Sequence, residues 1–162
     1  MGDFFIFGLG YAAGFVAARL RQAGWTVTAT GTDGALAFGD DHAVHTALAR
    51  ASHVLSSVPP DADGQDPVLA RYGDALRGKW LGYLSSTGVY GDTGGAWVDE
   101  SAPIGSGRRA ARAMADSAWS LIFKTASDNV FPEGPTGGMS TGASYVVACL
   151  LTLAGLMCAM TG

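Results

Sequence analysis

Short hydrophobic runs alternate with helical patterns along most of the chain. Residues 4–7 are wholly apolar, which is typical of a strand buried on both faces of a parallel sheet. Residues 12–23 then carry small and apolar side chains at helical spacing, and Gly24 supplies a stop signal. Further strands are predicted at residues 25–30, 35–38, 53–57 and 80–85, and further helices at 42–51, 67–76 and 108–123. This alternation predicts an α/β fold with a doubly wound parallel sheet of the Rossmann type.

The pattern changes towards the end of the chain. Beyond Glu133 there is no Asp, Glu, Lys or Arg, and residues 132–144 are rich in Gly, Pro, Ser and Thr. Residues 145–160 are then almost wholly apolar. We therefore predict a Rossmann domain over residues 1–123, a linker over 124–144 and an apolar, helical segment over 145–162.

The clearest chemical signal is Gly8-x-Gly10-x-x-Ala13, between the first strand and the first helix. Gly8 permits a tight turn, Gly10 lets the backbone approach a pyrophosphate, and the small Ala13 lets helix and strand pack closely. The first amides of the helix, those of Tyr11 and Ala12 among them, offer N–H groups and partial positive charge to phosphates. A strand before and a helix after are the context that this dinucleotide-binding fingerprint requires. The alternative is a structural turn in another kind of α/β protein.

The end of the second strand bears on the choice of cofactor. An acid about 20 residues past the glycines binds the ribose hydroxyls of NAD, whereas a basic residue there favours NADP. Thr32 and Asp33 lie near that place without an Arg, although Asp33 is equally suited to a turn ahead of Gly34. Asp40 either reaches the adenine or caps the next helix together with Asp41. The sequence thus predicts NAD or NADP, with NAD favoured.

Several motifs in a consistent order carry a family resemblance. They are residues 7–13, the loop 56–60, the segment 83–92 with sequence Tyr-Leu-Ser-Ser-Thr-Gly-Val-Tyr-Gly-Asp, residues 95–103, residues 106–108 and Trp119. Together, over about residues 3–119, they resemble the extended and atypical short-chain dehydrogenase/reductases, in their NAD-dependent epimerase/dehydratase-like branch. The resemblance implies that Ser57 and Pro59 contribute to the cofactor site.

The same resemblance implies catalytic residues. Ser86 and Thr87 stand where the family polarises a substrate carbonyl or hydroxyl beside the nicotinamide, and Tyr90 is in the same loop, either as a catalytic or as a packing residue. Complete members also use a Tyr-x-x-x-Lys pair, in which the lysine lowers the pKa of the tyrosine. No tyrosine of this chain has a lysine four positions later. The next helix carries arginines instead: Arg108, Arg109 and Arg112.

Composition and charge exclude other classes. A net charge of -4, with only two lysines, argues against a nucleic-acid partner. His42 and His45 lack a third ligand at metal-binding spacing, so we expect no metal and read them as exposed polar residues. Two cysteines make no disulfide framework, and the chain starts on a strand without a basic leader, so we expect a cytoplasmic protein.

The apolar segment at residues 145–160 has three interpretations. As a helix it is about 24 Å long, slightly short of the ~20 residues that span a bilayer, and no Lys or Arg flanks it. It is a buried helix that closes the sheet, a marginal membrane anchor, or a segment not selected to fold with this domain, as after a frameshift or truncation. Because motif agreement stops after Trp119, the third is favoured.

These observations lead to one expected function and its rivals. We expect an NAD(P)-binding oxidoreductase of the short-chain dehydrogenase/reductase type, with a small-molecule or nucleotide-sugar substrate. The rivals are a non-catalytic dinucleotide-binding module and a truncated, inactive family member. Ser86, Thr87 and Tyr90 favour the enzyme. The resemblance also implies a substrate-binding lobe after Trp119, to which nothing in this sequence matches, and this mismatch and the missing tyrosine–lysine pair favour the rivals.

Overall fold

The computed structural model describes residues 2–99, 102–103 and 110–130, with side chains except at positions 87 and 123–130. The chain divides into two compact units. The first consists of Met1–Val58 and Pro67–Tyr83, and the second of Pro59–Asp66 and the chain from Leu84 onward. The predicted apolar segment at 145–162 lies outside the described residues, so its three interpretations stay open.

The first unit is built on a parallel sheet. Its strands are β1 (Asp3–Phe7), β2 (Thr26–Ala29), β3 (Ala51–Ser56) and β4 (Trp80–Tyr83), in the order β2-β1-β3-β4. All neighbouring strands run parallel. The chain passes from β1 to β2 on one side and then to β3 on the other side of β1. The strand order therefore reverses between β1 and β3, which confirms the predicted Rossmann-type arrangement.

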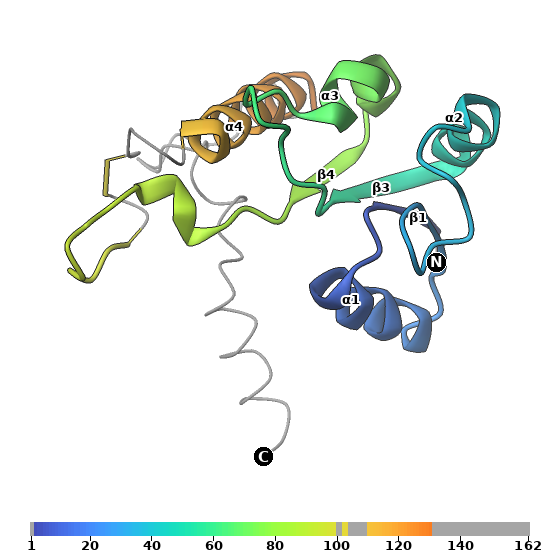
Figure 1. Cartoon of the computed structure of the whole chain (residues 1–162). Coiled ribbons are helices and arrows are strands. Elements are labelled where there is room, and N and C mark those ends of the chain that lie inside the picture. The colour runs from blue at the N-terminus through green and yellow to red at the C-terminus, as the bar shows by residue number, and fades with distance from the viewer. Residues whose placement is uncertain (1, 100–101, 104–109, 131–162) are drawn as a thin grey trace. The chain divides into compact units, whose positions relative to one another are not determined.

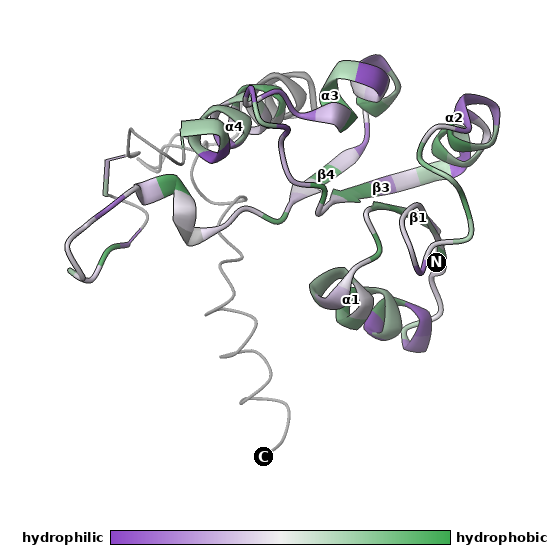
Figure 2. Cartoon of the chain, viewed as in Figure 1, coloured by the Kyte–Doolittle hydropathy of each residue, from purple (hydrophilic) through white to green (hydrophobic). Residues whose placement is uncertain are grey.

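Helices flank this sheet. They are α1 (Tyr11–Gln22), α2 (Asp41–Arg50) and α3 (Pro67–Tyr72), and a 3₁₀ turn, η1 (Gly73–Leu76), follows α3. Figure 1 shows α1 on one side of the strands and α2 and α3 on the other. Figure 2 shows hydrophilic residues on the outer turns of α2 and α3. The ring of Phe7, at the end of β1, stacks on the ring of Tyr72, at the end of α3, with ring centroids 5.3 Å apart. Aromatic packing thus joins α3 to the sheet.

Two predicted elements of this unit differ in the structure. The strand predicted at residues 35–38 is wrong, because Leu36 forms only one bridge, to Thr30. One turn precedes the segment, where the N–H of Gly34 donates to Gly31 O, and another begins at its end, where the N–H of Asp40 donates to Ala37 O. The helix predicted at 67–76 is α-helical only to Tyr72 and continues as η1 from Gly73, a residue type that weakens α-helices.

The second unit contains the loop Pro59–Asp66, a 3₁₀ turn η2 (Thr87–Tyr90) and the helix α4 (Ala110–Val130). α4 packs against η2, and its fully buried Trp119 donates through Nε1 to Asp66 Oδ2 at 2.7 Å. The helix continues past Phe123 into the range predicted as linker. Within the described part of the chain, every helix is too short or too polar to cross a bilayer.

Candidate functional site

The turn between β1 and α1 requires glycine at its first position. Gly8 has a positive φ of 80°, a conformation that L side chains rarely adopt. A Cβ atom there would also lie 3.0 Å from Val58 Cγ2 and 3.1 Å from Ser57 Oγ. The tight turn expected from the fingerprint is therefore present, and both conformation and space restrict this position to glycine.

Thr30, at the end of β2, holds the turn from one side. It is buried, with 1% of its surface exposed. Its Oγ1 accepts from Gly8 N at 3.2 Å, and its carbonyl accepts from Leu9 N at 2.7 Å. The next residue, Gly31, has a φ of 116°, and a Cβ there would lie 2.8 Å from Leu9 N. The sequence analysis did not identify either residue; a Thr-Gly pair at the end of the second predicted strand was the signal that could have found them.

Ser57, directly after β3, holds the turn from the other side. Its N–H donates to Phe7 O at 2.9 Å, and its hydroxyl donates to Gly8 O. The structure thus brings Ser57 together with the glycine turn at the carboxyl ends of β1 and β3. In open parallel sheets, ligands bind at this point, where the strand order reverses.

The N-terminus of α1 has the features of a phosphate site. Gly10 is its N-cap, no side chain caps it, and its first turn contains no acid. The first helical hydrogen bond runs from Gly14 N to Gly10 O at 2.8 Å, so the amides of Tyr11, Ala12 and Ala13 have no acceptor within the helix. A Cβ at Gly10 would meet no atom within 4 Å. Backbone donors and open space together fit a pyrophosphate.

The side chains around this helix end differ in exposure. Ala13 is completely buried, in keeping with the packing role expected of a small third residue. The ring of Tyr11 is 84% exposed and makes an edge contact with Phe15, with centroids 5.1 Å apart. Contacts of these residues with a cofactor stay a prediction.

The acids after β2 have local structural roles. Thr32 and Asp33 are exposed and form the turn closed by the Gly34 N–H and Gly31 O (3.0 Å), so the turn role of Asp33 is confirmed. Asp40 Oδ1 accepts from Ala43 N at 3.0 Å, which confirms it as the N-cap of α2. The predicted ribose and adenine contacts stay predictions.

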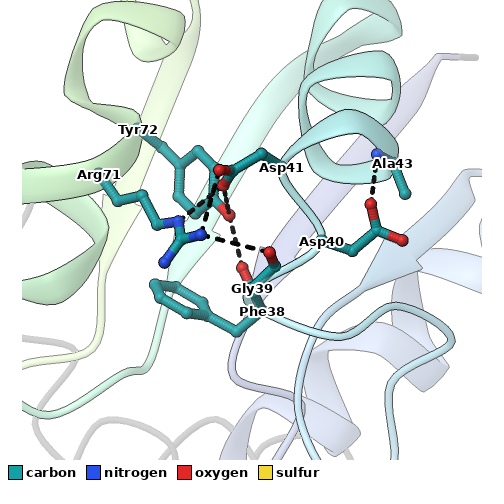
Figure 3. A network of polar contacts seen from close by, with 7 residues as sticks. All are labelled: Phe38, Gly39, Asp40, Asp41, Ala43, Arg71 and Tyr72. Atoms are coloured by element: carbon teal, nitrogen blue, oxygen red, sulfur yellow. Dashed lines mark hydrogen bonds and ion pairs between the residues drawn. The ribbon is translucent and has the colours of Figure 1, made fainter.

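A polar network ties this loop to α3 (Figure 3). Arg71 binds Asp41 through Nε to Oδ1 (2.6 Å) and Nη2 to Oδ2 (3.1 Å), and Nη2 also donates to Gly39 O at 3.2 Å. The Tyr72 hydroxyl shares its proton between Phe38 O and Asp41 Oδ1. Arg71, and then Tyr72, hold the pKa of Asp41 below its usual value. The network thereby fixes the end of the loop that carries Asp33 and Asp40.

We expect Tyr72→Phe to lower the free energy of unfolding by about 1 kcal/mol, because it removes the hydroxyl that joins Phe38 O to Asp41. Urea denaturation measures the change. Tyr11→Phe, at an exposed ring, is the matched control and should change stability by less than about 0.5 kcal/mol. Equal stabilities of the two variants would contradict the role of the Tyr72 hydroxyl.

The predicted catalytic residues, and also Pro59, belong to the second unit. Ser86 precedes η2, and its carbonyl accepts from Val89 N at 3.1 Å. Thr87 begins η2, and Tyr90, which ends it, is half-buried. Val89 is buried, whereas Pro59 is exposed. The backbone of this segment is thus ordered as a short 3₁₀ turn against α4.

No group of three metal-ligating side chains occurs among the described residues. His42 and His45 are both exposed on α2, as expected, and the His45 ring contacts Tyr72. Of the three arginines predicted on the last helix, Arg112 is half-buried on α4, while Arg108 and Arg109 lie outside the described residues.

No protein-family model matches the chain, and no curated protein sequence matches it. Solved structures do. A functionally unknown conserved protein from Silicibacter pomeroyi DSS is 33% identical with a TM-score of 0.60, over 75% of this chain and 50% of that one. A short-chain dehydrogenase/reductase superfamily protein from Agrobacterium tumefaciens, with bound NAD, is 20% identical with a TM-score of 0.58, over 77% of this chain and 46% of that one.

A UDP-rhamnose synthase from Acanthamoeba polyphaga mimivirus is 16% identical with a TM-score of 0.50, over 75% of this chain and 53% of that one. The chain thus spans about half the length of each of these structures. The predicted likeness to short-chain dehydrogenase/reductases is confirmed at the level of the fold, and the epimerase/dehydratase-like branch stays a prediction.

Proposed function

We propose that this chain binds a nicotinamide dinucleotide, NAD or NADP, at the turn between β1 and α1. The observation that carries the proposal is the uncapped N-terminus of α1 behind Gly10, where a Cβ would meet no atom within 4 Å. Three free helical amides at the positive end of a helix of 12 residues are suited to a pyrophosphate. The NAD bound by the Agrobacterium protein of the same fold supports the choice of ligand.

Each residue of the turn has a definite task in this proposal. Tyr11, Ala12 and Ala13 donate their amides to the phosphates, and Gly10 keeps the space above them free. Thr30 and Ser57 hydrogen-bond to Gly8 and Leu9 from two sides. The turn is therefore already held in its conformation before a ligand binds. Asp33 binds the ribose hydroxyls. When bound, the nicotinamide ring would supply hydride transfer.

We further propose an oxidoreductase of the short-chain dehydrogenase/reductase type, with a small or nucleotide-sugar substrate. Ser86 and Thr87 polarise a carbonyl or hydroxyl group of the substrate. Tyr90, in the same loop, is either a catalytic residue or a packing residue. A protein of this fold that acts in UDP-rhamnose synthesis supports a nucleotide sugar. The second candidate is a non-catalytic dinucleotide-binding module, which the absence of a Tyr-x-x-x-Lys pair from the sequence favours.

Titration of the purified chain with NADH and NADPH, followed by cofactor fluorescence, tests the proposal. We expect NADH to bind at least as tightly as NADPH, because residues 30–33 contain no Arg to pair a 2′-phosphate and Asp33 would repel one. A tenfold preference for NADPH, about 1.4 kcal/mol, would contradict this choice. No binding of either at millimolar concentration would overturn the proposed function.

A further inference from the structure

The end of α3 is fixed to the strand that leads into the glycine turn. Tyr72, the last residue of α3, is 1% exposed, and its ring stacks on that of Phe7, the last residue of β1. Phe7 directly precedes Gly8 and is itself completely buried. Two stacked rings in a close-packed core have little freedom to move, so the end of α3 keeps a constant place relative to Gly8.

Arg71 extends from this helix end to the loop that follows β2 (Figure 3). Its Nε and Nη2 donate to the two carboxylate oxygens of Asp41 at 2.6 and 3.1 Å, and Nη2 also donates to Gly39 O at 3.2 Å. These contacts lie on either side of Asp40 in the sequence. An exposed ion pair is usually worth little, but a two-point contact between guanidinium and carboxylate that also includes a backbone carbonyl restricts geometry. Arg71 therefore fixes the end of this loop.

The start of the same loop, residues 31–40, lies against the glycine turn. A Cβ on Gly31 would lie 2.8 Å from Leu9 N and 3.4 Å from the backbone of Gly8. In the middle of the loop, Leu36 N donates to the carbonyl of the last residue of β2 at 3.1 Å. The start and the middle are thus held beside the turn and the sheet, and the end is held by α3.

We propose that Arg71 is a positioning residue for the adenosine half of the dinucleotide, because it holds the end of the loop 31–40 in place relative to the glycine turn. The inference rests on the proposed function, in which Asp33 binds the ribose hydroxyls, and on the predicted contact of Asp40 with the adenine. The phosphates in that proposal bind to amides of α1, to which Arg71 makes no hydrogen bond among the described residues. The two parts of the ligand should therefore respond differently to the loss of Arg71.

Binding of ligand fragments tests this role. ADP-ribose carries both the adenosine and the pyrophosphate, whereas inorganic pyrophosphate carries only the phosphates. In Arg71→Ala we expect the affinity for ADP-ribose and NADH to fall about tenfold, because part of the binding free energy is then spent on ordering the loop. The affinity for pyrophosphate should stay within about twofold of wild type, since the amides of α1 are unchanged. Isothermal titration calorimetry measures all three ligands.

Two further variants separate geometry from charge. Arg77→Ala is the matched control, because Arg77 lies directly after η1 in the same unit and forms an exposed ion pair with Asp74, Nη2 to Oδ1 at 2.9 Å. It should leave all three affinities unchanged. Arg71→Lys keeps the positive charge but lacks the planar guanidinium fork, so it should bind ADP-ribose as weakly as Arg71→Ala. Wild-type affinity in the lysine variant would show that charge alone suffices and would overturn the positioning role.

Amide exchange of Asp40 and Ala43 tests the loop end without a ligand. Their N–H groups donate to Ala37 O and Asp40 Oδ1 in the folded chain. Exchange should become at least about tenfold faster in Arg71→Ala and keep its wild-type rate in Arg77→Ala. Unchanged exchange in Arg71→Ala, or equal losses of ADP-ribose and pyrophosphate affinity, would overturn the inference while NADH binding by wild type upholds the proposed function. Failure of the wild-type chain to bind NADH and ADP-ribose would overturn the proposed function, and the exchange rates would then show whether Arg71 orders the loop.

Discussion

Gly10→Val is expected to weaken NADH binding by about 100-fold, roughly 2.8 kcal/mol, while the protein still folds. The Cβ position of Gly10 is open, and its φ of −105° suits any residue, so the fold should tolerate valine at a cost of about 1 kcal/mol for the poorer N-cap. The valine methyl groups would instead occupy the space above the free amides of α1. Fluorescence titration measures the affinity, and circular dichroism verifies the fold.

Gly14→Ala is the matched control for this experiment. Gly14 lies one turn further along α1, and its Cβ position is equally open. Alanine there should stabilise the helix by about 0.5–1 kcal/mol and leave the affinity for NADH unchanged. If Gly10→Val binds NADH as tightly as Gly14→Ala, the pyrophosphate does not lie at this helix end and the proposed site is wrong.

Oxidoreductase turnover by this chain is expected to lie about 10²–10⁴-fold below that of enzymes with a complete tyrosine–lysine pair, the usual contribution of general acid/base catalysis. In the proposed function Ser86 and Thr87 supply hydroxyls that polarise the substrate, so we expect trace turnover instead of none. The assay follows oxidation of NADH and NADPH with aldehydes, ketones and nucleotide sugars. Ser86→Ala, Thr87→Ala and Tyr90→Phe should each abolish whatever turnover is found.

Two outcomes would contradict this expectation. Turnover at ordinary enzymatic rates that collapses in the three variants would show that the chain has another acid/base group in place of the missing pair. If trace turnover is unchanged in all three variants, these side chains do not contribute to it. The activity would then come from bound cofactor alone, which favours the non-catalytic module.

Much of the fold could be predicted because its signals are local. The apolar run of β1, the glycines after it and the helical pattern of α1 all lie within about 20 residues, and each reports burial or turn chemistry directly. The cap is one of the two roles predicted for Asp40, and it could be predicted for the same reason, since its partner, Ala43, is three positions away. The strand predicted at 35–38 is wrong because a short apolar run does not show whether a neighbouring strand lies close enough to pair with it. In the structure the segment forms one bridge, and a turn begins at its end.

The sequence alone determined the order of strands and helices, the glycine turn and the residue types suited to a dinucleotide. The tertiary structure decided which distant residues support that turn. Thr30 and Ser57 reach Gly8 across separations of 22 and 49 residues, and Arg71 reaches Asp41 across 30. It also decided the burial of Asp116, because nothing in a helical pattern shows that one oxygen of this carboxyl group lies buried without a hydrogen-bond partner among the described residues. Such contacts depend on which segments the sheet brings together, and local patterns carry no information about that.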